Sequence, residues 1–153
     1  MLEGILKLFA PRIELYIEPR EFRFTHGAHR ERIATYIFLA GDNRVMGVGE
    51  TFEGAEKCTR IDLFAPTSPS TKNKFAALEA FLRYGIRKVI KRKWTIRPLL
   101  YIRNAESLNH ICCGYQNSIL RLAAQTSGAY ECEIEGEQGV PGYRRQSAPQ
   151  PEP

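Results

Sequence analysis

Three histidines and four cysteines are the side chains of this chain that could most readily hold a metal ion, and their spacing does not favour a site. His26 and His29 are the nearest approach to a ligand pair, but no second pair follows at the short fixed spacing of zinc sites. We expect these two histidines in a solvated loop. Adjacent cysteines do not join a disulfide framework easily, so we predict four free thiols and no metal ion or cofactor. The cysteines are Cys58, Cys112, Cys113 and Cys132.

Carboxylates could instead gather for two-metal hydrolysis, as in ribonuclease-H-like enzymes. The candidates are Glu14, Glu18 and Asp62. Residues 12–18 alternate, however, with Ile13, Leu15 and Ile17 on one side and the two glutamates on the other, where exposed charge is normal. We therefore expect a protein that is not an enzyme.

A run of basic residues is the strongest candidate for a binding site. Seven lysines and arginines occur between positions 83 and 97 with no acidic residue among them. Basic residues late in a helix also complement the helix dipole, so a solvated helix end is the simpler explanation. As a binding patch they would contact an anionic partner. The residues are Arg83, Arg87, Lys88, Lys91, Arg92, Lys93 and Arg97.

The first nine residues form a second candidate surface. Leu2, Ile5, Leu6 and Phe9 have the spacing of one apolar helix face. The segment is too short to span a bilayer, but it could lie in a membrane interface or pack on protein. We treat residues 1–11 as an amphipathic N-terminal arm and leave these alternatives open.

The composition is that of a folded domain carrying these candidates. The chain has 153 residues, of which 43% are hydrophobic and 25% charged, with a net charge of +5. No apolar run approaches the ~20 residues of a transmembrane helix. The first ten residues have the wrong charge order for a secretory signal, so we expect a cytoplasmic protein.

Strand and helix patterns alternate in a defined order. Two hairpins come first, at residues 12–24 and 33–48, with a polar loop around Gly27 between them. An amphipathic helix should start near Lys72, and the strand at residues 98–102 should then run parallel to the first strand. A second long helix should start at residues 104–107 and end at Gly128, before a last strand at 130–134.

This order predicts an α/β fold: a mixed five-stranded sheet with two long helices packed on it. The domain should cover residues 12–135. Residues 136–153 have no apolar period and should form a disordered tail.

Several segments resemble the N-terminal half of the bacterial rod-shape actins, the MreB-like family. They are the amphipathic start, the strand at residues 13–17, Val45-Met46-Gly47-Val48-Gly49-Glu50, and the stretch from Arg121 to Glu131. The resemblance covers about residues 1–137. It implies an actin-like, ribonuclease-H-like subdomain and a role in a cell-shape cytoskeleton.

The departures from that family bear on its ATPase chemistry. Actin-like ATPases place an Asp-x-Gly-[Thr/Ser] phosphate loop after the first strand, whereas this chain has Ile17-Glu18-Pro19-Arg20-Glu21. Proline lacks an amide donor, and two glutamates would repel a triphosphate. The position of the family's water-positioning glutamate is Gln116 here, and an amide cannot accept a proton. The resemblance therefore implies a pseudo-ATPase.

Two functions are compatible with these observations. The first is a non-catalytic actin-like module that binds a protein partner, at a membrane surface or as a homo-oligomer, within a cell-shape assembly. The second is a small nucleic-acid-binding protein that uses the basic run with Trp94 or Tyr84 as stacking groups.

Overall fold

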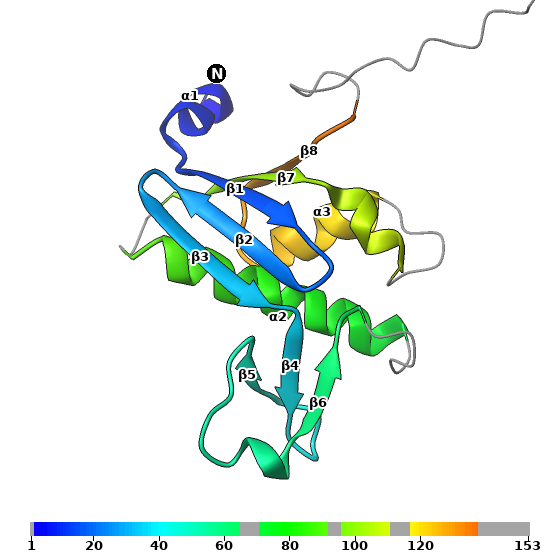
Figure 1. Cartoon of the computed structure of the whole chain (residues 1–153). Helices are drawn as coiled ribbons and strands as arrows, with labels where there is room; N and C mark the ends of the chain where they lie inside the picture. Colours follow the sequence, from blue (N-terminus) through cyan, green and yellow to red (C-terminus); the bar gives the residue numbers. More distant parts are fainter. Residues whose placement is uncertain (1, 65–70, 92–95, 111–116, 138–153) are drawn as a thin grey trace, which may run out of the picture.

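The computed structural model describes residues 2–64, 71–91, 96–110 and 117–137 (Figure 1). The predicted tail from 138 onward lies outside these residues, as do Arg92, Lys93, Trp94, Cys112, Cys113 and Gln116. In chain order the elements are α1 (Leu2–Phe9), β1 (Arg12–Ile17), β2 (Glu21–His26), β3 (His29–Ala34), β4 (Tyr36–Leu39), β5 (Val45–Val48), the 3₁₀ helix η1 (Ala55–Lys57), β6 (Thr59–Asp62), α2 (Thr71–Val89), β7 (Leu99–Arg103), the 3₁₀ helix η2 (Ala105–His110), α3 (Asn117–Thr126) and β8 (Glu131–Ile134).

The main sheet is mixed and five-stranded, with the order β3-β2-β1-β7-β8. Strands β1, β2 and β3 pair antiparallel as a meander, and β7 and β8 add parallel to β1. The predicted parallel pairing of the strand after the helix with the first strand is confirmed, with Arg12 opposite Leu99. The predicted mixed α/β class and five-stranded mixed sheet are therefore both correct.

Helices α2 and α3 pack together against one face of this sheet (Figure 1). Phe22 of β2 meets Phe81 of α2 with ring centroids 5.4 Å apart, and both side chains are fully buried. Gly85 brings the helix unusually close, because a Cβ there would lie 2.2 Å from the Phe24 ring. The alternating Ile13, Leu15 and Ile17 complete the core under the helices.

Strands β4, β5 and β6 form a separate three-stranded antiparallel sheet between β3 and α2 in the chain. Thr35 alone separates β3 from β4. It is 2% exposed, and its amide donates to Arg20 O while its carbonyl accepts from the Leu63 amide. A single buried residue, hydrogen-bonded on both sides, thus joins the two sheets.

Three details of the predicted element pattern are wrong. The polar segment around Gly27 is a tight turn between β2 and β3, made possible by Gly27 at φ 57°. The expected strand at residues 33–39 is divided between the two sheets. The second long helix is replaced by η2 and the ten-residue α3, so the described helices have 8, 19 and 10 residues rather than being two long ones.

None of the helices in the described ranges is both long and apolar enough to cross a bilayer.

Candidate functional site

The predicted basic surface lies on the C-terminal half of α2 and just beyond it. Arg83, Arg87 and Lys91 are exposed, and Arg97 is exposed ahead of β7. Lys88 is half-buried because its ammonium lies 5.3 Å from the centroid of the Tyr84 ring. A hydrogen bond to Tyr84 raises the pKa of Lys88, which keeps it cationic. The described part of the patch therefore offers positive charge to a partner.

One member of this patch also has a structural role. Arg83 donates to the carbonyl of Thr126, at the end of α3, over 3.3 Å. Cations complement the unpaired carbonyls at a helix C-terminus. Arg83 therefore helps to hold α3 beside α2, and Arg87 and Lys91 are the cleaner probes of a binding function.

The N-terminal arm is helical, and three of its apolar side chains are mostly exposed. Ile5 is 54% exposed, Leu8 81% and Phe9 65%. The opposite side of α1 is tethered, because Lys7 Nζ lies 2.7 Å from Glu131 and 3.9 Å from Glu133 on β8. The hydrogen bond to Glu131 raises the pKa of Lys7. The tether thus holds α1 at β8 while Ile5, Leu8 and Phe9 stay exposed.

The turn between β1 and β2 is the segment that the sequence resemblance compares with an actin-like phosphate loop. Its Glu18 amide donates to Glu21 O over 3.0 Å, and Pro19 has no amide to offer. The Glu18 carboxylate pairs with Arg23 at 2.5 Å. Turn and side chains are thus engaged with each other, and neither Glu18 nor Pro19 has a free amide to offer at this position.

Sequence reasoning did not identify the other face of the main sheet as a possible site. This face carries charged and aromatic side chains, and α2 and α3 do not cover it. The strand registers align Arg30, Thr25, Glu14, Tyr101 and Glu133 in one row across the sheet. The next row contains Arg32, Arg23, Tyr16 and Arg103.

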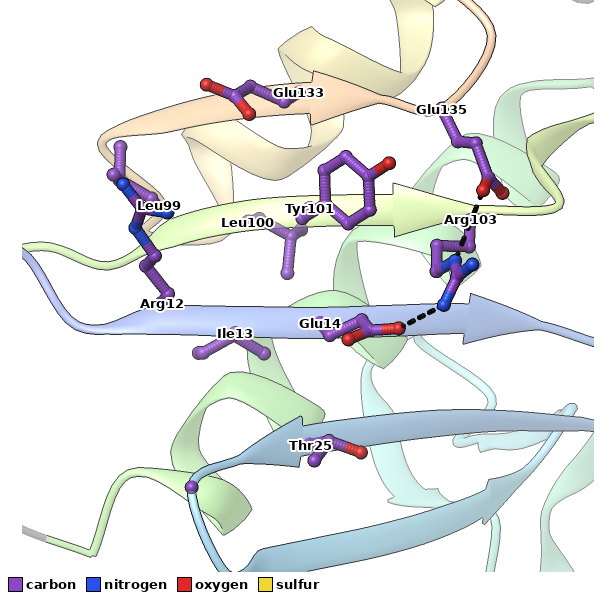
Figure 2. Close-up of a pocket in the computed structure, with 11 residues that line it drawn as sticks. Arg12, Ile13, Glu14, Thr25, Leu99, Leu100, Tyr101, Arg103, Glu133 and Glu135 are labelled. Atoms are coloured by element: carbon purple, nitrogen blue, oxygen red, sulfur yellow. Dashed lines mark hydrogen bonds and ion pairs between the residues drawn. The ribbon is translucent and has the colours of Figure 1, made fainter. Parts of the chain in front are cut away.

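A hollow of about 570 Å³ lies on this face over β1, β7 and β8 (Figure 2). Arg103 bridges it, at 2.9 Å from Glu14 and 3.3 Å from Glu135, and these carboxylates raise the pKa of Arg103. Tyr101 projects between Glu14 and Glu133. Partial burial, and then the charge of Glu135, raise the pKa of Tyr101 and keep its phenol neutral.

A second hollow of about 390 Å³ lies on the same face over β1, β2 and β3. Four arginines and two glutamates line it, whereas the first hollow is lined by two arginines and three glutamates. The Arg23 guanidinium stacks 4.6 Å from the Tyr16 ring centroid and pairs with Glu18. Arg30 and Arg32 extend from the edge strand β3.

The carboxylates considered for two-metal hydrolysis are not brought together. Glu14 pairs with Arg103, Glu18 pairs with Arg23, and Asp62 lies in the other sheet, where it accepts from the Phe64 amide. Within the described ranges no group of three or more His, Cys, Asp or Glu side chains is placed to hold a metal ion.

The described cysteines are free thiols, as predicted for these two positions. Cys58 is half-buried in the loop before β6. Cys132 lies on β8 with its side chain buried, and burial raises its pKa to about 12. A buried neutral thiol is a poor nucleophile, so Cys132 acts as a core residue.

Comparison with known proteins adds no relationship to these observations. No protein-family model matches the chain, and a search of curated proteins returns no significant match. The function must therefore be argued from the surfaces described above.

Proposed function

We propose that this chain is a non-catalytic actin-like module, a protein-interaction or regulatory component of a membrane-associated cytoskeletal assembly that determines cell shape. It would act in the cytoplasm, at the inner face of the membrane. Its partner would be a protein, with the membrane surface as a second contact.

The sheet supports the actin-like, ribonuclease-H-like part of this proposal. An antiparallel meander followed by two parallel strands, with the first strand central, is the order expected for one half of an actin-like fold. The residues that carry the sequence resemblance lie in α1, β1, β5 and the segment from α3 to β8.

The observation that carries the non-catalytic part is the β1–β2 turn. Pro19 lacks an amide, and the Glu18 amide is already bonded within the turn. The Glu18 carboxylate is held by Arg23 at the same place. An actin-like module with this turn would act through contacts rather than through ATP hydrolysis.

Two surfaces support the interaction part. The exposed cations Arg87 and Lys91 fit an acidic protein partner. The exposed Ile5, Leu8 and Phe9 of α1 fit the lipid interface. Neither signal is strong alone, and stable membrane association usually takes two.

Cross-linking in cells that naturally produce the protein tests this function. We expect wild-type chain to capture an actin-like filament protein, and Arg87→Glu/Lys91→Glu to lose it. Arg44→Glu/Lys57→Glu is the matched control, since it makes the same charge change at exposed positions outside the basic run. Equal capture by the wild type and the Arg87→Glu/Lys91→Glu variant would contradict the role of the patch.

The alternative function, nucleic-acid binding by the same basic patch, predicts a different result. Filter binding over a salt series would then show an affinity that falls steeply with salt, because phosphate contacts release counterions. Loss of that nucleic-acid binding in the Arg87→Glu/Lys91→Glu variant would favour nucleic acid over a filament protein as the partner.

A further inference from the structure

We propose that the uncovered face of the main sheet binds the same face of a second copy of this chain, in a weak two-fold dimer. The surface lies on the opposite side of the sheet from α2 and α3. The inference is therefore independent of the partner proposed for the basic patch.

The first step is the distribution of free charge on this face. Two of its inner arginines are already neutralised within the chain, Arg23 by Glu18 and Arg103 by Glu14 and Glu135. Apart from Arg12 on the central strand β1, which lines the first hollow, the charge that is left lies on the two outer strands. Outer strand β3 is basic and outer strand β8 is acidic.

Arg30, Arg32 and Glu133 are only loosely engaged, whereas Glu131 on β8 is held by Lys7 at 2.7 Å. No ion pair of Arg30 is found within the described ranges, and Arg32 lies 3.7 Å from Glu21 with 70% of its side chain exposed. On β8, the nearest cation to Glu133 is Lys7 at 3.9 Å. Both ends of the face can therefore take a new partner of opposite charge without breaking a close pair.

The second step is symmetry. Because β1 is the central strand, a two-fold axis parallel to β1 places β3 of each copy over β8 of the other. Arg30 and Glu133 end the same row, so this axis sets Arg30 of one copy opposite Glu133 of the other, twice. A two-fold axis perpendicular to the strands would instead place β3 of one copy over β3 of the other, so that basic side chains would face basic side chains. The outer charges select the first arrangement, in which Arg23 faces Arg103 of the other copy while each is already paired with a glutamate of its own copy.

The two hollows fit this arrangement. The hollow over β1, β7 and β8 has three glutamates and two arginines in its lining, and the hollow over β1, β2 and β3 has four arginines and two glutamates. The axis along β1 places each hollow over the other kind. Long side chains of one copy can then enter the hollow of opposite charge in its partner.

The area of the open sheet face limits how tightly the proposed dimer can associate. Five strands about 4.8 Å apart and about five residues long present roughly 400 Å² per copy. The total of about 800 Å² is below the 1,200–2,000 Å² of stable complexes, so we expect a weak, salt-sensitive dimer.

A charge-swap experiment tests the dimer by sedimentation velocity of the full chain over a wide concentration range at low salt. Arg30→Glu makes both ends of the face acidic, and Glu133→Arg makes both ends basic. Each single variant should self-associate at least about tenfold more weakly, since every contact occurs twice in the dimer. Arg87→Glu, the same charge change on α2, is the control and should dimerise as the wild type does.

Two further experiments, in which opposite charges face each other again, decide the question. An equimolar mixture of Arg30→Glu and Glu133→Arg should associate again, and the double variant Arg30→Glu/Glu133→Arg should self-associate like the wild type. A wild type that stays monomeric throughout would overturn the proposal. So would single variants that dimerise normally, or a failure of either rescue in proteins that melt like the wild type.

Discussion

Among single residues, Gly85 is the position at which the fold most clearly leaves no room for a side chain. It lies on the buried side of α2, where a Cβ would overlap the Phe24 ring at 2.2 Å. A glycine inside a helix costs about 1 kcal/mol relative to alanine, so its presence needs this close contact to offset the cost.

Gly85→Ala should therefore destabilise the protein although it improves helix propensity. Overpacking typically costs about 1–3 kcal/mol, and we expect a net loss in that range. Urea unfolding followed by circular dichroism measures it. Gly41→Ala is the control, since nothing lies within 4 Å of a Cβ there, and it should change stability by less than about 0.5 kcal/mol. Equal stability of both variants would contradict the packing argument.

Cys132 makes stability depend on pH in the alkaline range. Burial raises its pKa from 9.0 to about 12, so between these values the unfolded thiol ionises while the folded thiol keeps its proton. The stabilisation is complete below pH 9 and is lost as the pH rises towards 12.

Cys132→Ala should accordingly lose less stability than the wild type between pH 9 and 11. The difference in slope should approach 1.4 kcal/mol per pH unit, which corresponds to one proton. Denaturant unfolding at closely spaced pH values measures both slopes. Parallel slopes in the two proteins would show that the thiol ionises equally in both states.

The sequence predicts side-chain direction better than side-chain partners. Alternation correctly placed Glu14 opposite the apolar side of β1. Its partner Arg103 lies 89 residues further along the chain, and the pair depends on the register between β1 and β7. Register follows from the packing of the whole sheet, so no local pattern could have revealed this pair.

Helix prediction succeeded for α2 and failed for the segment after β7. The start of α2 was expected near Lys72 and occurs at Thr71. After β7, Asn104 adopts φ 58°. Its side-chain amide Nδ2 donates to Ile17 O over 2.7 Å, which ties the chain to the end of β1. The capping residues therefore begin a 3₁₀ helix at Ala105 rather than the long helix that their types suggest.

Helix α1 gives a prediction for membrane binding. Leu8→Glu/Phe9→Glu should lower recovery with floating anionic liposomes, because the charges would enter the lipid interface. Both side chains are mostly exposed, so stability should change by less than about 0.5 kcal/mol. Leu122→Glu, at a leucine on α3 that is 53% exposed, is the matched control.

A chain starting at Arg12 extends this test. It should float no better than the Leu8→Glu/Phe9→Glu variant and should keep its melting temperature. Equal flotation of the wild type and the shortened chain would remove α1 as an anchor, and a lower melting temperature would instead indicate an arm that stabilises the domain.

For the molecule as a whole, the mixed five-stranded sheet was predictable from the sequence. The separate three-stranded sheet, which takes up part of the strand expected at residues 33–39, was not. Strand periodicity continues from Ile33 through Leu39, yet the chain leaves the main sheet at Thr35. Its backbone bonds to Arg20 and Leu63 come from segments distant in the sequence. Such a change of sheet is decided by tertiary contacts, which the local pattern does not contain.

The whole fold also predicts the response to nucleotide. Isothermal titration calorimetry with ATP and Mg²⁺ should give no heat of binding, because Pro19 has no amide, the Glu18 amide is bonded within the β1–β2 turn, and residues 17–21 carry no hydroxyl. A dissociation constant in the micromolar range would contradict the proposed non-catalytic role and require a phosphate site elsewhere.

The central position of β1 has a consequence for synthesis. One side of β1 pairs with β2 almost at once, but its other neighbour begins at Leu99, 87 residues after Arg12 (99 − 12). At about 5–20 residues per second, a ribosome needs about 4–17 s to make that neighbour. Throughout this interval the nascent meander has an unpaired central edge, so conditions that slow elongation before residue 99 should increase co-translational aggregation.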